Sequence, residues 1–370
     1  MRIAVLWMVA VMMALPVPAG AQSAPLEEIR GILRTRALLA PPESVLGALT
    51  ETGLQDALAG VDPYARYFAS GQYVSPAAGH DSRVGIGADL VPRGKELFLA
   101  VYQGGAAASA GLPDRSRLVA VDGRDVLGLD PEAVARLLRG DEGTVVRIAI
   151  VSPVGVASTV VVRREPFRPL DVETVPPHNA VVRIREFVGG LTRPALLATL
   201  DFLARTSAGR AGADREPLII DLRDATGGDL YEAFDTAALF VPIGTLLGTL
   251  RGPGGESRPV RAPAGQKFDM PLALIVGPDT ASAAEIFAGA LQDNGRAKLL
   301  GQRTFGKCSS QTDVRLSDGS VLRFTNREIL LPGGDSCSGT GLSPDRMMDG
   351  EASADLASAV ATVRKMFTVD

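Results

Sequence analysis

The sequence predicts an α/β protein with a mixed-sheet core, a smaller β-rich module before it, and helical segments at both ends. Three observations predict this. From residue 166, apolar runs suited to buried strands alternate with segments of helical spacing. Leu218–Leu222 is continuously apolar, as in a strand covered on both faces. Residues 83–165 hold short strand patterns, turn signals and one short helix. A chain of 370 residues is long enough for these parts.

Composition excludes some function classes. Hydrophobic residues make up 46% of the chain and charged residues 22%, as in globular proteins in water. The net charge is −4 with both signs interspersed, so nothing indicates a nucleic acid or an anionic membrane surface as partner.

Residues 1–21 have the pattern of a secretory signal peptide. Arg2 supplies the positive region, Ile3–Leu15 is apolar, and Ala19-Gly20-Ala21 is a small-residue cleavage site. An uncleaved anchor is the alternative, but two prolines shorten the apolar run below the roughly 20 residues that a span needs. We therefore expect export to a periplasm or similar extracytoplasmic space, with no transmembrane span after cleavage.

Residues 22–82 are predicted to be a helical region. Leu26, Ile29 and Leu33 form one apolar stripe, and residues 45–58 carry a second, weaker helical pattern. The sequence leaves open whether this region caps the core or serves as an oligomerisation arm. At the other end, residues 351–370 are predicted to contain a last amphipathic helix, after a core over 166–350.

A candidate nucleophile follows a predicted strand in the core. Leu272–Val276 reads as a buried strand, 277–279 breaks it, and helical spacing begins at Ser282. At a helix N-terminus the first N–H groups lack intrahelical partners, so the Ala283 N–H could stabilise an oxyanion formed after attack by Ser282. The alternative is that Ser282 is only a helix cap.

The candidate base is a lysine. Lys307 follows Ser282 by 25 positions, and Gln311 comes four residues later. The two histidines, His80 and His178, stand near no Ser or Cys in a recognisable frame, which disfavours a Ser–His–Asp triad. A lysine can act as base where burial lowers its pKa.

These motifs together resemble the carboxyl-terminal processing (tail-specific) proteases. The resemblance rests on 281–286 (ASAAEI), 291–296 (LQDNGR), 304–307 (TFGK) and Gln311, and it extends over about residues 60–350. It implies a dyad of Ser282 and Lys307, with Gln311 supporting the lysine. Cys308 stands where the family usually has glycine.

Two further resemblances follow. Residues 223–228 (RDATGG) resemble the family element that supplies an oxyanion-hole amide, which implies this role for Gly227 or Gly228 together with Ala283. Residues 83–165 resemble a PDZ domain, in which a glycine loop, here Gly85-Ile86-Gly87, offers N–H groups to a peptide's terminal carboxylate. Taken alone, each of these loops is more often a simple turn.

The cysteines and two carboxylates complete the expectations. Two cysteines in an exported chain predict one disulfide, Cys308–Cys337, with Cys308 facing away from Lys307. No ligand spacing indicates zinc, and no cofactor or metal is expected. Glu285, one helical turn from Ser282, could orient the site. Asp293, roughly 16 Å along the helix, is too far to be a third triad member, and pairing with Arg296 or capping the helix is expected instead.

We therefore expect an exported serine endopeptidase that recognises substrate C-termini through its PDZ domain and cleaves with a Ser/Lys dyad. Its partners would be protein or peptide substrates with free apolar C-termini, and an activating adaptor or homo-oligomer is possible. The alternatives are a catalytically inactive PDZ-containing scaffold, for which Cys308 beside the base is the one favourable feature, and a fold relative that binds small lipophilic ligands.

Overall fold

The computed structural model describes residues 24–73, 83–102, 104–167, 171–175, 178–206, 216–265, 267–349 and 355–368. The predicted signal peptide lies outside the described residues, as does His80, and only the backbone of His178 is described.

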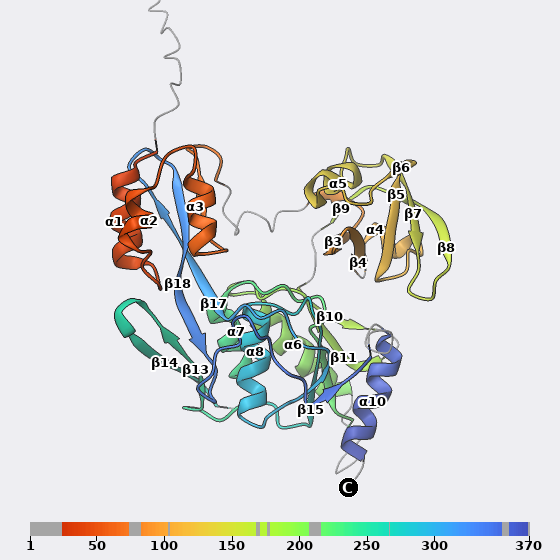
Figure 1. Ribbon diagram of the computed structural model, residues 1–370. Coiled ribbons are helices and arrows are strands. Elements are labelled where there is room, and N and C mark those ends of the chain that lie inside the picture. Colours follow the sequence, from red (N-terminus) through yellow and green to blue (C-terminus); the bar gives the residue numbers. More distant parts are fainter. Residues whose placement is uncertain are drawn as a thin grey trace, which may run out of the picture.

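The core is a six-stranded sheet with helices on both faces (Figure 1). In spatial order its strands are β10 (Val172–Val175), β11 (His178–Ile184), β12 (Leu218–Asp221), β15 (Leu272–Val276), β16 (Lys298–Gly301) and β19 (Arg346–Met347). The strands from β11 to β19 are parallel and β10 is antiparallel to β11, so the sheet is mixed, as predicted.

Alternate residues of these strands face two separate apolar clusters. Ile220 and Leu274 face one side, which is covered by α6 (Thr192–Thr206), α7 (Leu230–Ala237) and α8 (Ala283–Asp293). Ile219 and Ile275 face the other side, covered by α10 (Leu356–Thr368). The sheet is thus buried on both faces, which explains why its strands read as continuous apolar runs.

A second sheet forms a long ribbon that leaves the core (Figure 1). It contains β1 (Arg66–Phe68), β18 (Val321–Leu330), β13 (Leu246–Arg251) and β14 (Ser257–Arg261) in that order, and β17 (Ser309–Arg315) pairs with β18. The 3₁₀ turn η2 (Pro253–Gly255) joins β13 to β14. The helices α1 (Leu26–Arg36), α2 (Glu43–Gly47) and α3 (Leu54–Val61) pack on the ribbon against Leu316, Leu322 and Phe324.

The third part is a β-rich module with its own apolar core, centred on Leu99, Val134 and Ile148. Its main sheet contains β3 (Ala88–Arg93), β4 (Glu96–Val101), β5 (Ser116–Val121), β7 (Val145–Val151) and β8 (Ala157–Arg163), with β6 (Arg124–Asp125) beside β5. β2 (Arg83–Gly85) pairs with β9 (Glu165–Phe167), and the helices are α4 (Ala106–Ser109) and α5 (Pro131–Leu138).

Most predicted elements are present, with three differences. The expected helix over 45–58 is broken into α2 and α3. The predicted helical region also contains β1, which pairs with β18 of the core ribbon. The sequence pattern also predicts a helix over residues 230–240, but α7 ends at Ala237. The dipeptide Asp130-Pro131 predicts a helix cap followed by proline at the first helical position. The structure confirms this, because the Asp130 carboxylate accepts a hydrogen bond from Ala133 N at the start of α5.

Candidate active site

Ser282 occupies a sharp turn between β15 and α8. Its φ of 55° and ψ of −121° are those of the first central residue of a type II′ turn, where glycine is usual. Holding a serine there costs about 1–3 kcal/mol, which the surrounding contacts must offset. Thr280 supplies one of them, since its Oγ1 donates to Leu222 O at 2.8 Å and accepts from Gly277 N at 2.9 Å. The turn is therefore fixed to the end of β12.

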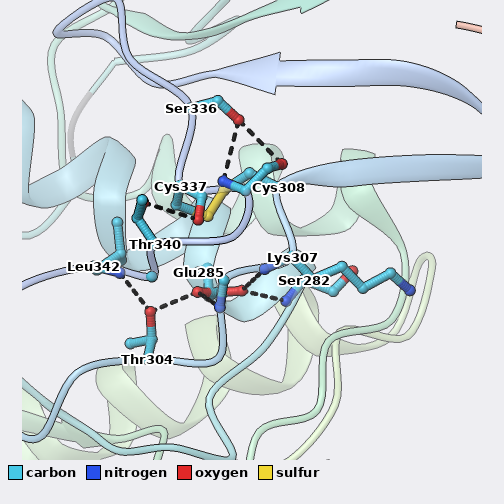
Figure 2. Close-up of a disulfide and its surroundings, with 12 residues drawn as sticks. Ser282, Glu285, Thr304, Lys307, Cys308, Ser336, Cys337, Thr340 and Leu342 are labelled. Carbon is cyan, nitrogen blue, oxygen red and sulfur yellow. Dashed lines mark hydrogen bonds between the residues drawn. A yellow bond between two sulfur atoms is a disulfide. The ribbon is translucent and has the colours of Figure 1, made fainter. Parts of the chain in front are cut away.

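Glu285 connects the serine turn to the lysine segment (Figure 2). Its carboxylate is fully buried and accepts four hydrogen bonds. Oε2 accepts from Ser282 N at 3.0 Å and Lys307 N at 2.7 Å. Oε1 accepts from Gly306 N at 2.7 Å and Thr304 Oγ1 at 2.5 Å. One carboxylate thus fixes the backbone of both candidate catalytic residues.

The environment of Lys307 lowers its pKa. Burial is the largest cause, and the nearby positive charge of Arg323 adds to it, while Asp62 acts in the opposite direction. The ammonium lies over the ring of Tyr64, 4.7 Å from its centroid. In the described part of the chain, no hydrogen bond joins Lys307 Nζ to Ser282 Oγ. The structure therefore holds the two residues at one site without the proton-transfer contact made.

A cavity of about 580 Å³ opens at this point. Ser282, Ala283, Lys307, Gln311 and Gly228 all line it. Its apolar part is formed by Leu250, Ile286 and Ile329.

Two residues with free backbone amides line this cavity from separate segments. Within the described residues, the N–H groups of Gly228 and Ala283 have no hydrogen-bond acceptor. Gly228 has a φ of 115°, and a Cβ there would lie 2.3 Å from Phe187 O, so only glycine fits. Gly227 is buried behind it, where a Cβ would lie 2.8 Å from Ser282 Cβ. Donors just before α7 and at the N-terminus of α8 suit a developing negative charge.

Comparison with known proteins shows which proteins this chain is similar to. The model of peptidase family S41 matches residues 178–348, and a PDZ-domain model matches 97–152. A carboxyl-terminal-processing protease of a Picosynechococcus species is 31% identical over 303 residues, which cover 78% of this chain and 70% of that protein. The chloroplastic carboxyl-terminal-processing peptidase 3 of Arabidopsis thaliana is 31% identical over 299 residues, 77% of this chain and 57% of that protein.

The chain belongs to peptidase family S41. The solved structure of a photosystem II D1 C-terminal processing protease resembles it with a TM-score of 0.63 at 25% identity, covering 91% of this chain and 95% of that one. The predicted fold class and family are confirmed. The chain spans little more than half the length of several relatives, including the plant peptidase.

Gln311 lies in the S41 cavity without contacting the lysine amine. Its Nε2 donates to Ser309 Oγ at 3.2 Å and to Thr325 Oγ1 at 3.1 Å. Thr325 is in turn bonded to Asp62, at the end of α3. Gln311 is therefore near the predicted dyad, but its supporting role stays a prediction.

The predicted disulfide Cys308–Cys337 is present (Figure 2). Cys308 is fully buried in the core, whereas Lys307 lines the cavity, so the two neighbours face different environments as predicted. The bond joins the lysine segment to the loop before Thr340 and Gly341. Gly339 N also donates to Gly306 O at 2.9 Å, so this loop supports the lysine segment from below the cavity.

Sequence reasoning missed or misjudged three residues at the site. Tyr64 was not expected to lie against the lysine, and Glu285 was expected to orient the site without any indication that it would bind the backbone N–H groups of both Ser282 and Lys307. The expected role of Asp293 is wrong: it accepts from Gly333 N, while Arg296 donates to three backbone carbonyls. For Glu285 the only local signal was its position three residues after the helix start, which fits a capping box.

The glycine loop of the PDZ domain connects β2, which ends at Gly85 and pairs with β9, to β3, the edge strand of the main sheet. The carbonyls of Ile86 and Gly87 accept from Ala107 N and Tyr102 N, whereas their own N–H groups have no acceptor among the described residues. Gly87 has a φ of 69°, and a Cβ there would lie 2.7 Å from Gly105 Cα. Among the described strands β3 pairs only with β4, which leaves its other edge open beside α5.

The described residues contain neither a candidate membrane span nor a candidate metal site. No helix there is both long and apolar enough to cross a membrane. No group of three or more His, Cys, Asp or Glu side chains there is placed to hold a metal ion.

Proposed function

We propose that this S41 protein is an exported serine endopeptidase that cleaves proteins after docking their C-termini on its PDZ domain. The observation that carries the proposal is the single cavity lined by Ser282, Lys307 and the Gly228 and Ala283 amides. A hydroxyl, a lysine of lowered pKa and two free N–H donors are the components of acyl transfer without a metal.

The reaction would proceed in two steps. The neutral amine of Lys307 takes the proton from Ser282 Oγ as that oxygen bonds to the substrate carbonyl carbon. The carbonyl oxygen becomes an oxyanion held by the Gly228 and Ala283 N–H groups, with Gly227 shaping the loop behind them. The lysine ammonium then protonates the departing amine, and water hydrolyses the acyl-enzyme by the same sequence.

The amine must first leave the ring of Tyr64 and approach Ser282. Rotation about the flexible four-carbon stem of Lys307 would make this approach, while the backbone stays fixed by Glu285. Substrate binding, an adaptor or a second copy of the chain could each favour this rotamer. Gln311 would orient the amine once it has moved.

Substrate recognition would use the open edge of β3. An extended C-terminal segment adds to this edge as a strand, and its carboxylate accepts from the N–H groups of the Gly85-Ile86-Gly87 loop. Leu90 on β3 and Leu137 on α5 are partly buried against the module's core and flank this edge, which favours an apolar terminal residue.

The site would work outside the cytoplasm. The signal-like residues 1–21 and the Cys308–Cys337 disulfide support an oxidising, extracytoplasmic compartment such as a periplasm. The name of the Arabidopsis relative also places that protein in the chloroplast rather than the cytosol.

Hydrolysis of an unfolded protein with an apolar C-terminus tests the proposal. Ser282→Ala and Lys307→Ala should each abolish cleavage with the fold retained, and the double variant should be no worse, because the two residues act as a unit. Ser338→Ala and Lys298→Ala, both at exposed positions, are the matched controls. Activity that survives Lys307→Ala would remove the dyad from the account.

A C-terminally amidated substrate separates docking from cleavage. Calorimetry should show weaker binding of the amide than of the free acid, since the amide removes the carboxylate that the glycine loop holds. Equal affinities would remove the docking role while leaving the peptidase assignment intact.

A further inference from the structure

The PDZ domain contacts both loops that form the candidate active site. Arg115, between α4 and β5, pairs with Asp224 at 2.8 Å, and Asp224 belongs to the segment 223–228 that carries Gly228. Arg93, at the end of β3, pairs with Asp279 at 2.9 Å, three residues before Ser282. The Arg115–Asp224 contact involves neither the edge strand β3 nor the glycine loop proposed to bind substrate.

The segment that holds Asp224 is mechanically coupled to the nucleophile. Ala281 N donates to Ala225 O at 2.9 Å, and Thr280 Oγ1 donates to Leu222 O at 2.8 Å. Asp224 lies between these two attachment points. A displacement of its side chain is therefore transmitted to the Gly228 amide and to the turn of Ser282.

The two ion pairs differ in strength. The side chains of Arg115 and Asp224 are only 13% and 4% exposed, whereas those of Arg93 and Asp279 are 43% and 19% exposed. Solvent and salt screen the exposed pair, so it contributes little to holding either loop in place. The buried pair is the one that can set loop geometry.

An arginine at position 115 carries three energetic penalties. Its φ is 60°, which is unfavourable for residues other than glycine, and its Nε has no acceptor among the described residues. Burial also lowers its pKa, so the charged form is retained against a desolvation cost. A glycine at this position would avoid all three penalties but would leave the buried Asp224 unpaired, so the contact with Asp224 is what offsets them.

The contacts of the preceding residue, Asp114, hold the loop that carries Arg115 against the core. Asp114 accepts from Arg183 of β11 at 3.0 Å and from Val101 N at 2.8 Å, which fixes the PDZ loop to the core sheet. Arg183 in turn pairs with Asp221, the last residue of β12. The loop that presents Arg115 is thus anchored to the strand from which the 223–228 segment departs.

We propose that Arg115 is a positioning residue for the peptidase reaction: through Asp224 it holds the 223–228 segment so that the Gly228 N–H faces Ser282. This rests on the proposed function. The PDZ domain then contributes to the active site itself, in addition to docking substrate. Loss of Arg115 should lower turnover by the same factor whether or not the substrate has a free C-terminal carboxylate.

Steady-state kinetics with two matched substrates test this. A quenched-fluorescence peptide is used as free acid and as amide, with the wild-type protein, Arg115→Gln, Arg115→Lys and the control Arg117→Gln, which alters a half-exposed arginine paired with Glu96 on the same domain. For Arg115→Gln we expect kcat to fall about tenfold or more for both peptides with KM within about twofold, since misplacing one oxyanion donor lowers kcat. Arg115→Lys should recover part of the loss, and Arg117→Gln should match the wild type.

Hydrogen exchange supplies a readout that a merely structural role would not move. In Arg115→Gln the amides of 224–228 should exchange faster while those of β15 stay protected. Unchanged kcat, a loss confined to the free-acid peptide, or unchanged exchange at 224–228 would each overturn the proposal.

Two other outcomes are an Arg115→Gln variant that does not fold and a wild-type protein that cleaves neither peptide. If Arg115→Gln does not fold, Asp224→Asn, of nearly equal shape, must show the same kcat loss and exchange pattern, and wild-type behaviour of this variant would refute the inference. If the wild-type protein cleaves neither peptide, the proposed function fails first, and hydrogen exchange still decides whether Arg115 holds the loop.

Discussion

Replacing Glu285 with glutamine tests how the two halves of the site are held together. Each carboxylate oxygen accepts two hydrogen bonds, and no positively charged side chain among the described residues forms a salt bridge with Glu285. Glutamine retains one oxygen and presents an NH₂ group at the other position. In its best orientation the oxygen still accepts from Ser282 N and Lys307 N, and the NH₂ group faces Gly306 N.

The magnitude follows from these contacts. The Gly306 N–H loses a bond to a charged acceptor, worth about 1.5–3 kcal/mol, and is left buried without a partner. The bonds to Ser282 N and Lys307 N become neutral and weaken by about half. We therefore expect Glu285→Gln to lower the free energy of unfolding of the core by about 3 kcal/mol or more. A shift of about 1 Å in the lysine backbone would lower kcat by about 100-fold.

Urea unfolding and peptide hydrolysis measure the two effects on one preparation. Glu142→Gln, in an exposed loop of the PDZ domain, is the control for the loss of one negative charge. Cleavage should remain low at low temperature, where the variant is folded, because the defect is in geometry and not in the folded fraction. Wild-type kcat with a loss of stability below about 1 kcal/mol would show that Glu285 does not hold the site.

Two further predictions concern the lysine segment. Because burial and Arg323 lower the pKa of Lys307, kcat/KM should rise with pH along a limb whose midpoint lies below the ordinary lysine value of 10.5, and Arg323→Gln should move this limb to higher pH. The unfolded chain binds more protons than the folded one between the lowered pKa and 10.5, so Lys307 should also make the free energy of unfolding rise with pH across that window. An Arg323→Gln variant with the same pH profile of kcat/KM as the wild type would show that Arg323 does not lower the pKa of Lys307. Replacing Cys308 and Cys337 together with serine should lower the free energy of unfolding by about 3.6 kcal/mol, the chain-entropy value for a separation of 29 residues. Reductant should destabilise the wild type and leave this variant unchanged. Equal urea midpoints for the oxidised and the reduced wild type would refute the predicted stabilisation by the disulfide.

The sequence predicted the features that depend on local pattern. β15 has the predicted bounds, because a continuous apolar run between breakers allows little else. The turn at Ser282 and the cysteine pair were also identified, the first from the strand-to-helix change and the second from the count of cysteines in an exported chain. Cys308 is buried away from the cavity, which removes the feature that favoured an inactive scaffold.

Contacts between distant segments were not predictable in the same way. Glu285 accepts from residues 19 to 22 positions away, and the Tyr64–Lys307 contact joins the N-terminal region to the segment before β17. The Arg115–Asp224 pair joins residues 109 positions apart across two domains. A charged residue in a loop has the same local pattern whether it is solvated or buried against another domain, so only the packed structure distinguishes the two cases.

Covalent labelling with a serine-reactive fluorophosphonate tests the central claim most directly. The account predicts that peptide mapping by mass spectrometry finds the label on Ser282 of the wild-type protein. It also predicts that Lys307→Ala is labelled at least about 100-fold more slowly, because the general base is lost. Label on another residue, or equal labelling rates for the wild type and Lys307→Ala, would contradict the assignment of Ser282 and Lys307 as nucleophile and base.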